Sequence, residues 1–590
     1  MKEKKVNLWS ATKRINAFIF KCCPRYYLSM CLFMIIQSLL FASTIFVTQF
    51  VFDRVTELSH GQRTIWEAII AISIFAFVLA ATEITNGIVN FKYSIISNWM
   101  HGFMCKMVAK KTAKLDPILF EDPKTLDEIN KAQGATYLAS WIGMNMTLMV
   151  IFYVPYFFVI IFYLYQLNPL LVWSIALAFI PKLIAMLTKM PLYSKLEDKS
   201  APIRREYEFY EQAMIDRQFF KETRILGAFD YFKQKYLQTL KLLNRETWRT
   251  DSKSATIDLT MSLMTVVGYL GILYLLFISL QNGIITIGAF AAVFGSIASL
   301  IWMMEEILVW NLGYIMEGMG RLSYLIRFFD LPEKTGEERE VNWTGDIEIN
   351  NVSFTYPNAA TESLRSLTLT IKSGETIAIV GENGAGKSTL TKVLMGIYEP
   401  TEGDITVSGV KIEDVANVSR FKGISAVFQK FQRYQLTLKE NIEISDIHVN
   451  QEIIPVMEQA GVEFDSKTYP NGIETILSRE FDGVDLSGGQ WQRIAIARGL
   501  YRSHDLIILD EPTAAIDPIE ESRLYEMFTK LAKSKTAIIV THRLASAQLA
   551  DRILVMEDGR IAEEGTHQDL MARNGLYAKM FKSQEQWYMS

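Results

Sequence analysis

A glycine-rich loop in the second half of the chain carries the clearest chemical pattern. Residues 381–389 read GENGAGKST, which fits the phosphate-loop pattern G-x-x-x-x-G-K-[ST]. The apolar run Thr376–Val380 before it predicts a buried strand, and Leu390–Tyr398 after it predicts a helix. Glycines let the backbone approach a phosphate closely, and a helix start directs free N–H groups at it. We therefore predict that a nucleotide binds at Gly381, Asn383, Gly384, Gly386, Lys387, Ser388 and Thr389.

Two acidic residues extend this chemistry towards hydrolysis. The apolar run 506–509 predicts a strand that ends in Asp510 and Glu511. A carboxylate at a strand end beside a phosphate loop can hold Mg²⁺, here Asp510 through water, while the Ser388 hydroxyl holds the same ion. Glu511 can polarise the attacking water, and Lys387 can hold the β- and γ-phosphates.

Further polar and aromatic side chains lie at the ends of predicted strands. Gln429 follows the strand Ile424–Phe428, and His542 ends the strand Lys535–Thr541. A histidine beside the γ-phosphate can hydrogen-bond it and sense hydrolysis. Tyr356, at the end of an alternating stretch ahead of the loop, can stack on adenine because an aromatic face offers a broad contact to a flat base. The alternative for Tyr356 is ordinary packing.

A second anion-binding pattern precedes the acidic strand. The stretch 486–490 reads LSGGQ and comes directly before a predicted helix, Trp491–Tyr501, whose first N–H groups can hold an anion. The chain has one phosphate loop, so a second phosphate-contacting helix start needs another explanation. Dimerisation supplies it, because this helix start can cap the nucleotide bound by the other protomer. We expect that contact to involve Ser487, Gly488, Gly489 and Gln490.

The first half of the chain predicts a membrane domain. The 590 residues are too many for one domain, and 50% of them are hydrophobic although 21% are charged. Six apolar stretches are each long enough to cross roughly 30 Å of hydrocarbon as a helix. They are Tyr26–Phe52, Ala68–Phe91, Ile142–Tyr165, Leu170–Leu192, Ile257–Leu280 and Ile284–Val309.

The connections between these stretches predict the orientation. Two of them are long and rich in Lys and Arg, which places them, both termini and the second half in the cytoplasm. Both keep a helical pattern, over Lys92–Lys114 and Leu192–Tyr210, and reach turn-like tips near 115–128 and 216–227. We expect these tips to touch the nucleotide-binding half. The predicted domains are 1–330 in the membrane, a linker at 331–344 and an α/β domain at 345–590.

Several single residues remain open to interpretation. Glu83 and Lys182 lie deep in the second and fourth stretches, where a charge is costly. The alternatives are an ion pair between them, within one chain or between two chains, a shared polar cavity, or a snorkelling Lys182 with a solvated Glu83. Glu305 and Glu306 are expected to be solvated at the inner interface. Leu8–Phe20 is an amphipathic stretch that can lie along the inner membrane surface.

Other classes of protein are disfavoured. The net charge of −4 gives no support for a nucleic-acid partner. The start of the chain lacks the apolar core and cleavage site of a signal peptide. The four cysteines lie near or within apolar segments and are interpreted as free thiols.

Taken together, these motifs resemble the ATP-binding cassette (ABC) transporter family. The match covers the phosphate loop, Gln429, the LSGGQ stretch, Asp510–Glu511, Asp517 and His542, all in family order, and six spans before one cassette resemble a bacterial exporter half-transporter. The resemblance implies a homodimer with two ATP molecules sandwiched between cassettes. It implies ATP and Mg²⁺ as cofactors, with Ser388, Gln429 and Asp510 at the metal, and Glu511, His542 and Lys387 in catalysis. It also implies coupling helices at the two tips and a place in the bacterial cell membrane.

The substrate stays open between several classes. The run 428–437, FQKFQRYQLT, and the run 486–493, LSGGQWQR, look similar to exporters of lantibiotics and other modified peptides. Lys430 and the segment 479–485 depart from common exporter patterns. A peptide exporter of this kind implies modification enzymes as partners, and a separate protease if a leader peptide is removed. A lipid or multidrug exporter and an ATP-gated channel are the alternatives.

Overall fold

The computed structural model describes residues 8–334, 336–449, 451–511 and 535–589. Contacts divide the chain into two compact units. The first comprises Met1–Lys111 and Asp127–Leu331, and the second comprises Thr112–Leu126 and Pro332–Ser590. The short stretch Thr112–Leu126, called here the α3–α4 segment, therefore folds with the second half of the chain although it lies between helices of the first.

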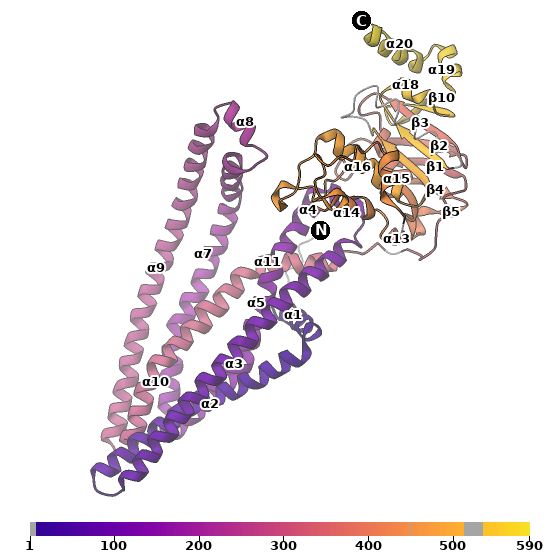
Figure 1. The fold of residues 1–590 in the computed structure, drawn as a ribbon. Helices are drawn as coiled ribbons and strands as arrows, with labels where there is room; N and C mark the ends of the chain where they lie inside the picture. The colour runs from indigo at the N-terminus through magenta and orange to yellow at the C-terminus, as the bar shows by residue number, and fades with distance from the viewer. Residues whose placement is uncertain (1–7, 335, 450, 512–534, 590) are drawn as a thin grey trace. The chain divides into compact units, whose positions relative to one another are not determined.

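The first unit is helical (Figure 1). Its α-helices are α1 (Leu8–Cys22), α2 (Pro24–Ser59), α3 (Ile65–Thr112), α4 (Pro123–Gly134), α5 (Thr136–Leu148), α6 (Val154–Leu167), α7 (Pro169–Ile215), α8 (Phe220–Ile225), α9 (Phe229–Gln281), α10 (Ile287–Glu305) and α11 (Tyr314–Asp330). Two π-helical turns, η2 (Met149–Tyr153) and η3 (Glu306–Gly313), continue α5 and α10. Within the described residues, six helical stretches are long and apolar enough to cross a membrane, which confirms the predicted number of spans.

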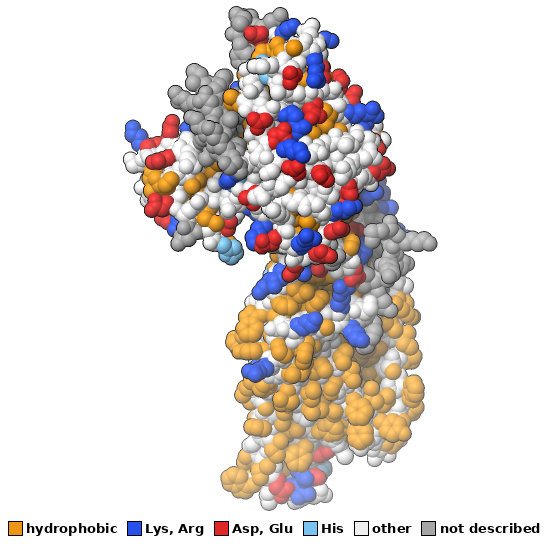
Figure 2. All heavy atoms as spheres, turned by 90° about the vertical axis from the view of Figure 1, so that its right-hand side faces the viewer, with side chains coloured by type: hydrophobic (Ala, Val, Ile, Leu, Met, Phe, Trp, Pro, Cys, Tyr) orange, Lys and Arg blue, Asp and Glu red, His pale blue; other side chains and the backbone are white. Residues whose placement is uncertain are grey.

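The outer surface of this unit is apolar, as a membrane-spanning protein requires. Figure 2 shows hydrophobic side chains covering the face of the helical unit that it presents. Trp173 is 74% exposed and Phe158 is 73% exposed. Patches of this extent are covered by lipid or by another protein chain, because a water-soluble surface rarely exposes so many large apolar groups. The chain is a multi-pass membrane protein.

Polar contacts join α7 and α9, which run side by side to the short helix α8 (Figure 1). Lys189 pairs with Asp258 at 2.8 Å. Lys182 donates to Ser262 of α9 at 3.0 Å and pairs with Glu305 of α10 at 2.8 Å. Within the chain, the partner of Lys182 is therefore Glu305 and not Glu83, and Glu305 is paired as well as partly exposed. Depth along two spans does not reveal which way each helix is rotated.

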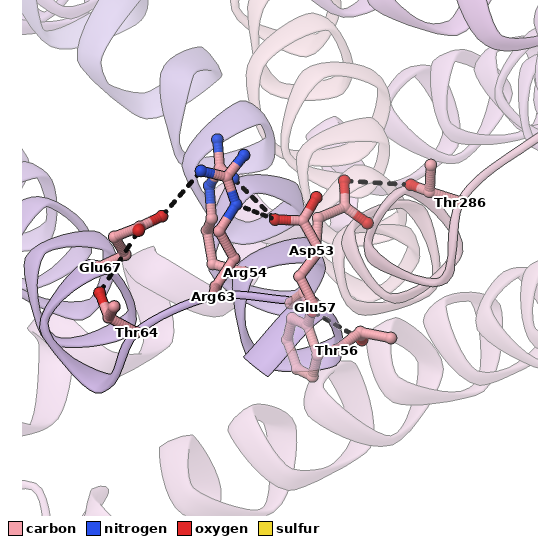
Figure 3. A network of polar contacts seen from close by, with 9 residues as sticks. Asp53, Arg54, Thr56, Glu57, Arg63, Thr64, Glu67 and Thr286 are labelled. Carbon is pink, nitrogen blue, oxygen red and sulfur yellow. Dashed lines mark hydrogen bonds and ion pairs between the residues drawn. The ribbon is translucent and has the colours of Figure 1, made fainter. Parts of the chain in front are cut away.

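At the turn between α2 and α3, a polar network ties two spans together (Figure 3). The Asp53 carboxylate accepts hydrogen bonds from the Gly288 N–H at 2.9 Å and the Thr286 hydroxyl at 3.1 Å, so α2 caps the start of α10. Gly288 permits this approach, because a Cβ there would lie 2.4 Å from the Gln49 carbonyl oxygen. Arginine–carboxylate pairs extend the network around the turn, through Arg54, Glu57, Arg63 and Glu67.

Helix α1 contains the stretch that the sequence predicts to lie along the inner membrane surface, a location that stays a prediction. Its apolar stripe, with Ala11, Ile15 and Ile19, is buried inside the first unit. Gly143 of α5 accommodates it, because a Cβ at that glycine would lie 2.6 Å from Ile15. The apolar stripe of α1 is therefore covered by protein.

The second unit contains two sheets. One has the order β2-β1-β4-β5 and the other has the order β10-β9-β3-β8-β7-β6. The strands are β1 (Ile347–Phe354), β2 (Leu364–Ile371), β3 (Thr376–Gly381), β4 (Glu402–Val407), β5 (Val410–Lys411), β6 (Gly423–Val427), β7 (His504–Asp510), β8 (Thr536–Val540), β9 (Arg552–Glu557) and β10 (Arg560–Gly565). Strands β6, β7, β8, β3 and β9 are parallel. Their runs of Ile, Val and Leu are buried on both faces, as expected for a parallel sheet.

Helices cover these sheets. They are α12 (Lys387–Leu394), α13 (Asn417–Arg420), α14 (Leu438–Glu443), α15 (Ile453–Gln459), α16 (Gly488–Tyr501), α18 (Leu544–Ala547), α19 (His567–Arg573) and α20 (Leu576–Met589). The 3-10 turns of this unit are η1 (Pro117–Glu121), η4 (Ile412–Asp414), η5 (Gly472–Glu474) and η6 (Arg479–Phe481). A helical membrane unit followed by an α/β unit is the predicted fold class.

Candidate ATP-binding site

The topology of the six-stranded sheet explains why distant residues meet. The order β3-β8-β7-β6 places the carboxyl ends of four parallel strands at one edge of the sheet. Ligands of open α/β sheets bind at this edge. The phosphate loop follows β3, His542 follows β8, Glu511 follows β7 and Gln429 follows β6. Residues up to 161 positions apart along the chain therefore converge on one site.

The phosphate loop has the backbone shape that its sequence predicts. Gly386 has a φ of +100° and forms the N-cap of α12, which begins at Lys387. A Cβ on Gly386 would lie 2.7 Å from the Ser363 carbonyl oxygen, so a side chain does not fit there. The free N–H groups of the first turn of α12 are therefore presented by a tight glycine turn.

Lys387 is buried within the curve of this loop. Its side-chain nitrogen donates to the carbonyl oxygens of Gly381 and Glu382, both at 2.9 Å. Burial lowers the pKa of Lys387, and the nearby carboxylates of Glu511 and Asp510 oppose that shift. Phosphate oxygens offer the same ammonium group a stronger, charged acceptor than two carbonyl oxygens do.

Ser388 and Asp510 meet on the floor of the site. The Ser388 hydroxyl donates to the Asp510 carboxylate at 3.1 Å. Asp510 is 5% exposed, and burial, together with the charge on Glu511, raises the pKa of its carboxyl group. A buried carboxylate beside a hydroxyl is an oxygen donor set of the kind that Mg²⁺ prefers. The residues present therefore fit a bound magnesium ion.

Glu511 is held in an unusual backbone conformation at the centre of the site. Its φ is +47°, in the left-handed region that non-glycine residues rarely adopt, and its N–H donates to the Val540 carbonyl oxygen at 3.0 Å. The Gln429 amide donates to the Glu511 carboxylate at 2.6 Å, and the His542 ring lies 3.6 Å from it. A strained backbone conformation at one residue, maintained by the surrounding structure, is typical of catalytic positions.

Tyr356 lies beside the loop in a cluster of three aromatic rings. Its hydroxyl is 3.3 Å from the Thr389 hydroxyl. Its ring forms T-shaped contacts with Phe354 and Tyr398, with centroid distances of 5.0 and 5.8 Å. Tyr356 is half-buried, whereas Phe354 and Tyr398 are buried. The two buried rings fix the position of the partly exposed one.

The LSGGQ stretch forms the start of α16. Ser487 is the N-cap: its hydroxyl accepts the N–H of Gln490, and the Gln490 side chain accepts the N–H of Ser487. This reciprocal capping box orients the first turn, Gly488–Gln490, as an anion-binding helix start. The nucleotide-contacting role of Ser487, Gly488, Gly489 and Gln490 stays a prediction.

The structure brings together most of the residues predicted from the sequence. Lys387, Ser388, Gln429, Asp510, Glu511 and His542 lie at one sheet edge, joined by the contacts described above. Asp517 lies outside the described residues. Sequence reasoning missed Tyr398, which packs beside Tyr356, and Glu121, which accepts a hydrogen bond from Tyr398. No local sequence pattern predicts their contact, because the two residues lie 277 positions apart and meet only in the folded unit.

Comparison with known proteins identifies related chains. A family model described as ABC transporter matches residues 364–514. The subtilin transport ATP-binding protein SpaT of Bacillus subtilis is 34% identical over 372 residues, which cover 62% of this chain and 60% of SpaT. The chain thus matches less than two thirds of the length of that relative.

Two further comparisons cover more of the chain. The probable multidrug resistance ABC transporter ATP-binding/permease protein YheI of Bacillus subtilis (strain 168) is 32% identical over 439 residues, covering 70% of this chain and 72% of YheI. The fold is similar to that of a bacterial Atm1-family ABC exporter solved with ATP bound. The TM-score is 0.77 at 21% identity, over 95% of this chain and 99% of the other.

Proposed function

The chain belongs to the ABC transporter family, and from this premise we propose that it is an ATP-driven exporter that works as a homodimer. One observation carries the proposal. A membrane unit with six candidate spans is fused to a site where Lys387, Glu511 and His542 converge on the nucleotide-binding edge of a sheet. Fusion in one chain links ATP chemistry directly to the spans.

In the proposed reaction, the phosphates of ATP lie in the loop between β3 and α12. Lys387 exchanges its two carbonyl acceptors for phosphate oxygens, and the free N–H groups of α12 bind the same phosphates. Glu511 orients the attacking water and accepts its proton, while Gln429 and His542 position the Glu511 carboxylate. Tyr356 stacks on the adenine base.

Mg²⁺ is the metal that fits this site. Ser388, Asp510 and Gln429 would hold it, directly or through water. When bound, it would supply positive charge that offsets the negative charge of the phosphate oxygens. The residues of the chain still determine where the water and the nucleotide lie.

The proposed homodimer follows from what one chain contains. Each chain supplies a phosphate loop and an LSGGQ helix start, so two copies form two complete sites when Ser487–Gln490 of one copy caps the nucleotide of the other. The proposed location is a bacterial cell membrane with both termini in the cytoplasm, supported by the basic connections.

ATP hydrolysis by the purified chain tests the activity. We expect Mg²⁺-dependent ATPase activity from the full chain in lipid nanodiscs. We expect none above background from Lys387→Ala, which removes the ammonium group that holds the phosphates. An active Lys387→Ala variant would contradict the proposed site.

A peptide is the proposed substrate, supported by the similarity to the subtilin transport protein and by the FQKFQRYQLT and LSGGQWQR runs. Modification enzymes and a separate leader protease are the partners this proposal implies. The observation that supports the multidrug alternative is the match to YheI, which covers a larger share of both chains than the match to SpaT does. Inverted membrane vesicles containing the chain distinguish them: ATP-dependent uptake of subtilin but not ethidium supports a peptide exporter, and the reverse supports a multidrug exporter.

A further inference from the structure

The α3–α4 segment contacts the aromatic cluster that holds Tyr356. Leu115 is 2% exposed, and Ile118 packs against the main core of the second unit. Backbone contacts reinforce this packing, because the Lys334 N–H donates to the Lys114 carbonyl oxygen at 3.0 Å. The segment is therefore an integral part of the ATP-binding unit.

Glu121, the last residue of η1, meets the buried ring of Tyr398. The Tyr398 hydroxyl donates a hydrogen bond to the Glu121 carboxylate. Lys392, on α12 directly behind the phosphate loop, lies 4.0 Å from Glu121 and 5.2 Å from the centre of the Tyr398 ring. Burial and the Glu121 carboxylate raise the pKa of Tyr398, so this hydroxyl stays a donor. A hydroxyl donating to a carboxylate is a strong, charge-assisted hydrogen bond.

A second contact lies next to the first. The Asn358 side chain donates to the Asp122 carboxylate at 3.1 Å. Asn358 follows Tyr356 by two positions, so two consecutive residues of the segment contact Tyr398, whose ring packs against Tyr356, and the side chain of Asn358. The segment therefore contacts one ring that packs against Tyr356 and one side chain that lies close to Tyr356 in sequence.

The aromatic cluster transmits the position of Glu121 to Tyr356. Phe354 and Tyr398 stack at 5.5 Å with an interplanar angle of 8°, and the Tyr356 ring lies nearly perpendicular to both. A close-packed group of rings does not deform continuously, so a shift of Tyr398 displaces the ring beside it. We propose that Glu121 is a positioning residue for the adenine base, acting through Tyr398 on Tyr356.

This inference rests on the proposed function, because it takes Tyr356 as the adenine contact. According to this inference, the α3–α4 segment affects the binding of the adenine base and does not affect the binding of the triphosphate. Linkage between two sites is reciprocal. If the Glu121–Tyr398 contact favours binding of the adenine base to the aromatic cluster, then binding of the base also stabilises that contact. Binding of the nucleotide would then stabilise the position of the α3–α4 segment, which directly follows α3 in the chain.

Binding of ATP and of inorganic tripolyphosphate, which lacks a base, tests the inference. Both affinities are measured for the full-length chain in nanodiscs by calorimetry. We expect Glu121→Ala to weaken ATP binding about fivefold, within the range for one base–aromatic contact, and to leave tripolyphosphate binding within about twofold of the wild type. Glu121→Gln keeps an acceptor for the Tyr398 hydroxyl and should restore ATP affinity.

Two further variants sharpen the test. Tyr398→Phe keeps the ring and removes the donor, so it should resemble Glu121→Ala, and the double variant should be no weaker than either single one. Glu333→Ala is the matched control, because it breaks the Lys114–Glu333 pair beside the same segment and leaves Glu121 and the three rings unchanged.

The outcomes separate the inference from its premise. Suppose that the wild type binds ATP more tightly than tripolyphosphate. The role of Glu121 alone would then be overturned if Glu121→Ala weakened the binding of both ligands equally, or if it left the affinity for ATP unchanged. A wild type that binds ATP no better than tripolyphosphate would overturn the adenine role of Tyr356, and the inference with it.

Discussion

At the scale of single residues, the site depends on where its carboxylates are held. Glu511 has a strained φ, a backbone hydrogen bond to β8 and a 2.6 Å contact with Gln429, which together leave its carboxylate little freedom. A residue fixed in this way is pre-organised to orient one water molecule. A substitution at Glu511 should therefore impair hydrolysis without impairing nucleotide binding.

Replacement of Glu511 tests this separation. Glu511→Gln keeps the size of the side chain and removes the base, so we expect ATP binding to persist while turnover falls by about 10²-fold or more. The variant should accumulate with ATP bound. Asp505→Asn, at the opposite end of β7, is the matched control and should hydrolyse ATP at the wild-type rate. Near-normal hydrolysis by Glu511→Gln would show that another group, with His542 first, activates the water.

At the scale of elements, charged side chains fix how the spans pack. Lys182 of α7 contacts Ser262 of α9 and Glu305 of α10, so one ammonium group joins three helices. The Lys182 side chain is 13% exposed and that of Glu305 is 45% exposed. Removing one partner leaves the other charge without its partner in an apolar unit, which is costly.

A double-mutant cycle measures this pair. We expect Lys182→Met and Glu305→Gln each to lower the melting temperature of the chain in nanodiscs by several degrees. The double variant should lose clearly less than the sum of the two, because coupled charges in contact are non-additive. Strictly additive losses would mean that the two side chains do not stabilise each other in the membrane.

The cap between α2 and α10 gives a second test at this scale. Asp53→Ala removes the acceptor of the Gly288 N–H and should cost about 1 kcal/mol, the usual value of a helix cap. Asp53→Asn keeps an oxygen acceptor and should lose less. Thermal unfolding of both variants, beside Gln62→Ala at an exposed position of the same turn as control, checks the ranking. Equal stability of Asp53→Ala and the wild type would contradict a capping role.

The elements also show what sequence patterns can and cannot predict. Gln429, Asp510 and Glu511 could be predicted because each ends a strand, and parallel strands bring their ends to one edge. The pairing of Lys182 with Glu305 could not be predicted, because similar depth along two spans leaves helix rotation undefined. The contact between Glu121 and Tyr398 could not be predicted, since it depends on the α3–α4 segment packing within the second unit.

At the scale of the whole molecule, the two units divide the work. The first presents an apolar surface and six candidate spans, and the second gathers the residues for ATP chemistry. Both are encoded in one chain, together with a single LSGGQ helix start whose Ser487 and Gln490 cap α16. The central claim is that two copies of the chain share each ATP site.

Mixed dimers test this claim most directly. Lys387→Ala disables the phosphate loop and Ser487→Arg disables the LSGGQ helix start, so each variant alone should lack ATPase activity. Co-expressed with different affinity tags and purified through both, they form dimers in which one shared site keeps an intact Lys387 and an intact Ser487. We predict that these mixed dimers hydrolyse ATP well above either variant alone. Mixed dimers as inactive as the separate variants would contradict sites shared between two chains.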